Sequence, residues 1–161
     1  MGEFADVEQK LKRALGLSGQ PVKRGTMAHD HHVYMILADT AAQLEDAIAL
    51  RQYTPLLEEL ALRDNHRHYR AIAQRAHGVA HRLAGDYTEA EECLNQALEL
   101  FGESMTPWQI GRTLFELAEL DTARSNKVRA REYLSRALEE FETMKAMPDV
   151  ERTRLALEAL G

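Results

Sequence analysis

Seven histidines, all between His29 and His81, are the side chains best suited to chemistry such as metal binding. They form three groups, AHDHH with His29, His31 and His32, NHRHY with His66 and His68, and HGVAH with His77 and His81. An i, i+4 pair such as the last one lies on one helix face and can bind a metal. A zinc site needs three or four ligands, however, and this pair lacks the glutamate of the HExxH motif. We therefore predict no metal site. The alternative is a helical sensor domain that binds a metal or a small molecule through its histidine-rich helices.

Charged side chains of opposite sign occupy two successive segments after position 65. The first carries Arg67, Arg70, Arg75 and Arg82, and the second carries Glu89, Glu91, Glu92 and Glu99. In one interpretation these are two solvated faces, whose surface ion pairs each contribute little stability. In the other, the arginines form a basic stripe that attracts an acidic partner.

Residue patterns typical of catalysis do not occur. Ser104, Ser125 and Ser135 have no motif around them, and no pair of carboxylates stands out as acid and base. The glycines are placed to end helices rather than to form a phosphate-binding loop. Cys93 falls in an apolar helical pattern, where we expect a small buried side chain. We predict a protein that is not an enzyme and has no cofactor.

The composition limits the class of protein and of partner. With 161 residues, 45% of them hydrophobic and 29% charged, the chain is long enough for a real core. Its net charge of −6 argues against general nucleic-acid binding, which needs clustered lysines and arginines. One cysteine excludes an intrachain disulfide, and no apolar run approaches the roughly 20 residues of a membrane span. We expect a cytoplasmic protein with no nucleic-acid or membrane partner.

Apolar residues recur with helical spacing along the chain, and no stretch alternates as a strand would. We predict an all-α fold of about eight helices. Glycine, proline and capping residues mark their ends, with Pro55 in a first turn and Gly85 just after a helix. The predicted helices are 5–16, 28–52, 54–63, 66–84, 88–102, 107–124, 127–145 and 150–160.

The segment from Gly85 to Phe101 has a counterpart later in the chain. Ala90, Leu94, Ala97 and Leu98 recur at a constant offset as Ala130, Leu134, Ala137 and Leu138, and Phe101 recurs as Phe141. Small residues at such positions let paired helices approach closely, while larger ones fill the grooves. Each helix pair then leaves an apolar face that only the next pair can cover.

This pattern resembles the tetratricopeptide repeat family, in a variant whose spacing is longer than the norm of about 34 residues. The residues that carry the resemblance are Gly78, Gly85, Asp86, Tyr87, Ala90, Leu94, Ala97 and Leu98, followed by Leu117, Ala118, Ala130, Leu134, Ala137 and Leu138. It implies a right-handed array of antiparallel helix pairs, an α-solenoid. It also implies a non-catalytic scaffold that binds a protein or peptide, as part of a larger regulatory or signalling assembly.

In this family the first helix of each pair lines a groove that binds the partner. The resemblance therefore implies a groove formed by Met35, Glu45, Ile72, Arg75, Val79, Arg82, Arg112, Phe115 and Glu119. We expect Arg75, Arg82 and Arg112 to share one face and to attract an acidic segment of the partner.

The N-terminal segment, residues 1–26, is predicted to be one helix and a glycine-rich loop, and residues 27–161 the repeat domain with a C-terminal capping helix. The helix at 5–16 has the pattern of a second helix without its first. Three arrangements are open: the chain is cut from a longer array, the helix folds back on the next two, or it docks on a second copy to form a homodimer. We favour folding back, because a loop of about ten residues closes at small entropic cost.

Overall fold

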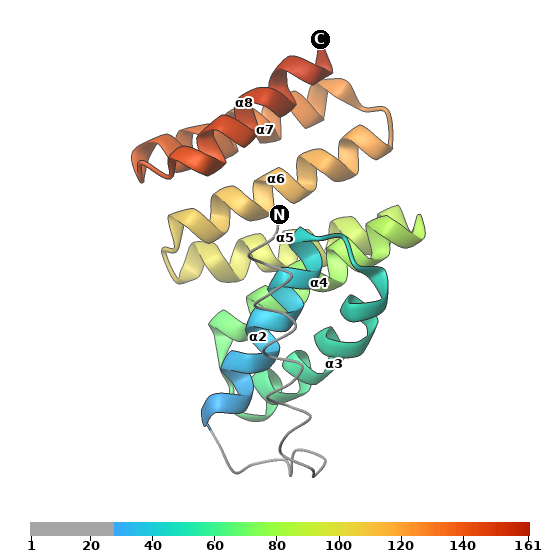
Figure 1. The fold of residues 1–161 in the computed structure, drawn as a ribbon, viewed down its shortest axis with the longest axis vertical. Helices are drawn as coiled ribbons and strands as arrows, with labels where there is room; N and C mark the ends of the chain where they lie inside the picture. Colours follow the sequence, from blue (N-terminus) through green and yellow to red (C-terminus); the bar gives the residue numbers. More distant parts are fainter. Residues whose placement is uncertain (1–27) are drawn as a thin grey trace.

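The computed structural model describes residues 28–161, and the expected helix at 5–16 with its homodimer contact lies outside them. The described residues form seven helices and no strand. The helices are α2 (Ala28–Gln43), α3 (Ala47–Arg63), α4 (Arg67–Ala84), α5 (Tyr87–Glu103), α6 (Pro107–Ala123), α7 (Lys127–Thr143) and α8 (Met147–Leu160). Antiparallel pairs α2–α3, α4–α5 and α6–α7 stack in chain order, and α8 covers the last pair (Figure 1). The predicted all-α array of helix pairs is confirmed.

The connections follow one rule throughout the described array. From α3 onward the helices begin at even intervals along the chain, and one residue of each short loop has a positive φ. These residues are Glu45, Asn65, Gly85, Met105, Ser125 and Lys145. In each loop the next N–H bonds back to a carbonyl in the last turn of the preceding helix, as from Asp86 N to His81 O at 2.9 Å. This is a Schellman ending, which satisfies the last carbonyls of one helix and turns the chain into the next.

The first helix pair differs from our prediction. We expected one helix over 28–52 and another from position 54, but the chain breaks at Glu45 and resumes in α3. Pro55 therefore lies inside α3 rather than in a first turn. The break carries no glycine or proline, because Glu45 itself adopts the left-handed conformation with φ of 53°. Asp46 supplies the missing start signal, since its carboxylate accepts from the Ile48 and Ala49 amides at 3.0 Å.

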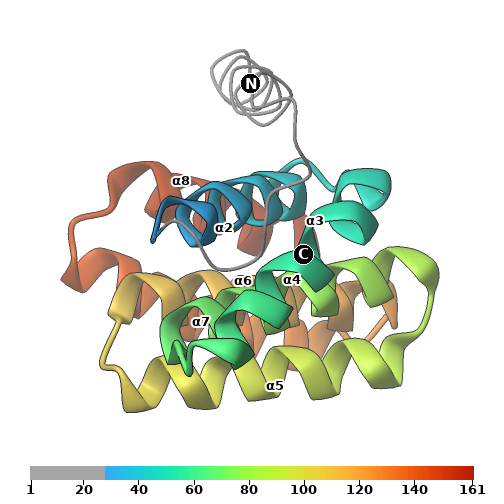
Figure 2. The ribbon, with the colours of Figure 1, turned by 90° about the horizontal axis from the view of Figure 1, so that it is seen from below.

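The core lies between the inner helices α2, α4 and α6 and their outer partners α3, α5 and α7. Figure 2 shows α5 on the side of the array opposite α2. Gly78 lies where α4 crosses α5, and a Cβ there would meet Leu94 Cγ at 2.5 Å. Ala90 and Ala130 are fully buried at the predicted crossings. The repeated small residues thus allow close helix approach, as the sequence predicts.

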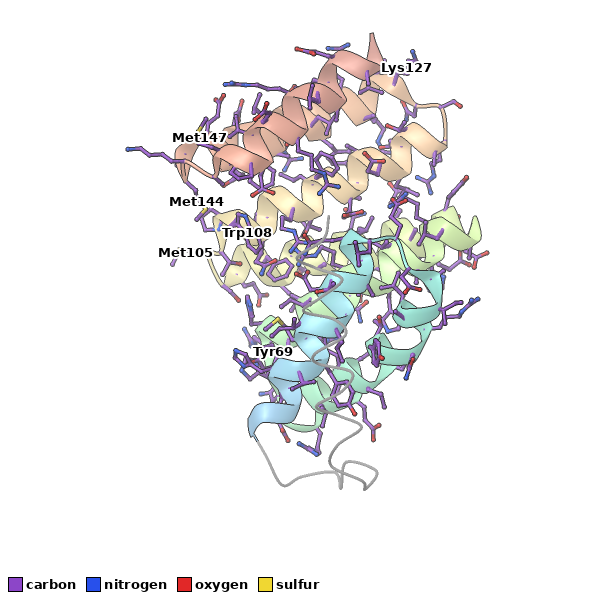
Figure 3. All side chains as sticks on the ribbon, in the orientation of Figure 1. Tyr69, Met105, Trp108, Lys127, Met144 and Met147 are labelled. Atoms are coloured by element: carbon purple, nitrogen blue, oxygen red, sulfur yellow. The ribbon has the colours of Figure 1, made fainter. Side chains whose placement is uncertain are left out.

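The two edges of the array are formed by alternate loops. Met105, Met144 and Met147 lie on one edge, beside the starts of α6 and α8, and Lys127 lies on the other (Figure 3). Trp108 connects α6 to α8 at the first edge, because its Nε1 donates to Asp149 Oδ2 at 3.0 Å. Within residues 28–161 no helix has the length and apolar character needed to cross a bilayer.

Candidate functional site

The inner helices meet at a group of buried charges that we call the inner-face cluster, comprising Asp39, Arg75 and Arg112. Arg75 Nη2 donates to Asp39 Oδ1 at 2.8 Å, and Arg112 Nη1 donates to both oxygens of Asp39 at 3.0 and 2.8 Å. The Arg75 side chain is 1% exposed, that of Arg112 7%, and that of Asp39 17%. One carboxylate of α2 thus joins α4 and α6 across the face.

Aromatic rings and a backbone carbonyl of α5 and α6 also contact the two guanidiniums. Arg75 Cζ lies 5.2 Å from the centre of the Phe101 ring, and Arg112 Cζ lies 4.9 Å from that of Trp108. Arg75 Nη1 also donates to the Gln109 carbonyl at 3.3 Å. These cation–π contacts and this hydrogen bond fix the arginines through α5 and α6.

Burial and charge act against each other in the inner-face cluster. Burial would raise the pKa of Asp39, but the Arg112 and Arg75 guanidiniums outweigh it and hold that pKa below its usual value. Burial and the neighbouring Arg112 charge lower the pKa of Arg75 to about 10. Asp39 and Arg75 are therefore charged at neutral pH, and the cluster places two guanidiniums around one carboxylate.

A second ion pair group lies further along the same face, around Arg82. Arg82 Nη2 is 2.7 Å from Glu45 Oε1 and 3.4 Å from Glu116 Oε2. Glu45 is exposed, whereas Glu116 is buried, and burial raises the pKa of Glu116 despite the arginines around it. Arg82 Nε is buried and has no hydrogen-bond partner among the described residues.

A family model described as tetratricopeptide repeat matches residues 69–143, which run from the start of α4 to the end of α7. A search of curated proteins gave no match. Residues 69–143 are a tetratricopeptide repeat segment. Such repeats generally mediate protein–protein interactions and are typically non-catalytic scaffolds.

The predicted groove residues lie on α2, α4, α6 and the α2–α3 loop, and few of them are accessible. Ile72, Val79 and Phe115 belong to the buried core, and Arg75 and Arg112 are covered within the inner-face cluster. Met35, Arg82 and Glu119 are partly exposed, and Glu45, which we expected on a helix, is exposed in the α2–α3 loop. Arg152 of α8 adds to the repeat face, with its Cζ 4.1 Å from the centre of the Phe115 ring.

Sequence reasoning missed Asp39 and Glu116, the acids that pair with these arginines. Asp39, Val79 and Glu119 are evenly spaced in the sequence, so Asp39 occupies in the first repeat the position that the other two occupy in theirs. The constant repeat offset alone could have found it. Our expected first helix ran through the α2–α3 loop, which obscured that register. Glu116 gave no such signal, because its equivalent in the preceding repeat is Ala76.

Several histidines of α2, α4 and the loop before α4 contact an acidic or aromatic side chain. His31 Nε2 lies 2.8 Å from Asp64 Oδ2, and His77 Nε2 lies 3.0 Å from Glu58 Oε2. The His66 ring stacks on Tyr69 with centres 3.9 Å apart. Among the described residues, no three histidine, cysteine, aspartate or glutamate side chains gather closely enough to hold a metal ion.

Cys93 differs from our expectation of a buried side chain. It is partly exposed on α5, and burial together with the charges of Glu58, Glu92 and Glu89 raises the pKa of its thiol. A raised pKa keeps the thiol protonated, which disfavours nucleophilic chemistry.

Proposed function

We propose that this chain is a non-catalytic protein- or peptide-binding module of a larger regulatory or signalling assembly, and that it binds along the inner-helix face. One observation carries the proposal. The side chains of three successive inner helices converge on this face, so closely that Asp39 of α2 bonds to Arg112 of α6. A rigid face assembled from several repeats suits recognition of an extended segment.

The accessible part of the face would make the contacts. Met35 on α2 offers an apolar, adaptable side chain, and Glu119 on α6 offers a carboxylate. Glu45 of the α2–α3 loop and Arg82 of α4 form an ion pair whose exposed member, Glu45, a partner can reach. The buried members of the predicted groove, Ile72 and Val79 among them, would then position this surface rather than contact the partner.

A selection from a displayed peptide library against the whole chain tests the proposal. We expect enriched peptides to lose most of their affinity for the variants Met35→Glu and Glu119→Arg. Both changes lie on the inner-helix face at positions that are only partly buried, so folding should survive.

Glu139→Arg is the matched control, because it makes the same charge change on exposed α7, an outer helix. Binding should persist in this variant, with circular dichroism confirming that all variants fold. Equal loss in Glu119→Arg and Glu139→Arg would place the site elsewhere, and a selection that enriches no peptide would argue against the function itself.

A further inference from the structure

The attachment of α2 to the array depends more on charge than that of the inner helix α6. Its fully buried apolar residues are Leu37, Ala38, Ala41 and Ala42, three of them alanines. Side chains as small as alanine remove little apolar area from water. By contrast, α6 buries Leu114, Phe115, Leu117 and Leu120. The Asp39 carboxylate supplies the ion pairs that fix α2 to α4 and α6.

The arginines that bind Asp39 are held in place without α2. Phe101 of α5 and Trp108 of α6 lie against the two guanidiniums, and the Gln109 carbonyl accepts from Arg75. If α2 moved away, these contacts would remain. They would then present two positive charges, fixed side by side, to the solvent. Such a preorganised pair of guanidiniums binds a carboxylate strongly and specifically.

We infer that α2 is an internal occupant of an anion-binding site formed by Arg75 and Arg112, and that an acidic segment of the partner takes the place of Asp39 when α2 leaves. This inference rests on the proposed function and names the ligand class of the same face. The short loop around Glu45 is the hinge, since it is the chain connection between α2 and α3, and the packing of α2 on α3 must open with the contacts to α4.

Hydrogen exchange on the intact wild-type chain tests whether α2 is a separable element. We expect the amides of α2 to exchange at least about tenfold faster than those of α4 and α6, through an opening that leaves the other helices folded. Added sodium chloride should widen this difference, because the opened charges are hydrated and screened. If α2 exchanges at the same rate as α4 and α6, it leaves only on global unfolding and the inference is wrong.

A synthetic peptide of residues 28–43 tests the anion site directly. It should bind the full-length Asp39→Asn variant, whose own α2 is weakened, at least about tenfold more tightly than the wild-type chain. The same peptide carrying Asp39→Asn should bind at least about tenfold more weakly than the native peptide. Equal binding of the two peptides would show that the carboxylate is not recognised and would overturn the inference.

The two experiments separate this inference from the proposed function. If the Asp39→Asn chain does not fold, the exchange rates of the wild-type α2 amides still decide. A failed library selection together with fast exchange of α2 and carboxylate-dependent peptide binding would leave the anion site standing and remove the partner-binding role. A successful selection with slow exchange of α2 would keep the partner-binding role and remove the inference about α2.

Discussion

Two contacts of the same helix, α4 with α5 and α4 with α2, are built in different ways. The α4–α5 contact is apolar and close, with Gly78 against Leu94 and no room for a Cβ between them. The α2–α4 contact combines small alanines with the buried pair of Asp39 and Arg75. The first depends on shape. The second depends on whether Asp39 and Arg75 are ionised, and on whether another charged group can take the place of either.

The difference shows where this array can change without unfolding. An apolar contact loses its stabilisation when the surfaces part, and a small ion cannot restore it. A buried ion pair can be exchanged for another pair of the same charge, although leaving one partner alone is costly. Conformational change should therefore concentrate at α2, and the repeats from α4 to α7 should behave as one rigid body.

The largest effect should come from removing the charge that holds α2. We expect Asp39→Asn to lower the free energy of unfolding by about 3–5 kcal/mol, because it leaves two buried guanidiniums with no carboxylate. Urea unfolding measures it. The control is Glu103→Gln, which removes an exposed pair with Arg67 and should cost at most about 1 kcal/mol. Equal costs for the two variants would mean that the inner-face cluster does not stabilise α2.

The apolar contact should respond to volume instead. Gly78→Ala places a methyl group 2.5 Å from Leu94 Cγ and should destabilise by about 1–3 kcal/mol. Gly102→Ala, at a helical site with open space around it, should stabilise by up to about 1 kcal/mol through helix propensity. Thermal unfolding of both variants gives the comparison. A neutral Gly78→Ala would show that α4 and α5 can separate slightly at no cost.

Acid should weaken the α4 start, where His68 packs on Phe101 with ring centres 5.7 Å apart. Burial, with the charges of His66 and Arg75, lowers the pKa of His68 below its usual 6.5, and Asp39 opposes this only in part. The unfolded chain therefore takes up the proton first, and the stability contributed by neutral His68 is lost as the pH falls below 6.5. His68→Phe should lose less stability than wild type between about pH 7.5 and about pH 5.5 in urea unfolding. If His68→Phe and wild type lose the same stability between these two pH values, the acid sensitivity comes from other groups.

The smallest effects should come from substitutions in the loops. Two of them together measure the stability contributed by the Glu45–Arg82 ion pair. Ser125→Gly relieves a φ of 61° at an exposed loop position and should stabilise by about 0.5–1 kcal/mol. Glu45→Gly relieves a similar φ of 53° but also removes the 2.7 Å contact with Arg82. Its net gain, measured by the thermal midpoint, should be smaller. Should Glu45→Gly gain as much as Ser125→Gly, the Glu45–Arg82 pair contributes nothing to stability.

The helices from α4 to α8 could be predicted because their signals are local. Gly85 ends α4, Pro107 begins α6, and small and large apolar residues recur at a constant offset. The α2–α3 break could not be predicted from glycine or proline, since Glu45 occupies the left-handed position there. Five of the six such loop residues in the described array are not glycine. Their conformation is imposed by the packing of the flanking helices, which overrides the local preference.

The sequence by itself determined the repeat, the helix pairs and the resemblance to a family, because apolar periodicity and helix ends are set by neighbours along the chain. It also predicted that Arg75, Arg82 and Arg112 share one face. Only the tertiary structure decided that they are paired, because the acids they meet lie far from them in sequence, on other helices and loops. With 26 acidic residues in the chain, no local rule selects Asp39 as the one opposite two arginines. That choice follows from how the inner helices pack, since an ion pair depends on distance in space.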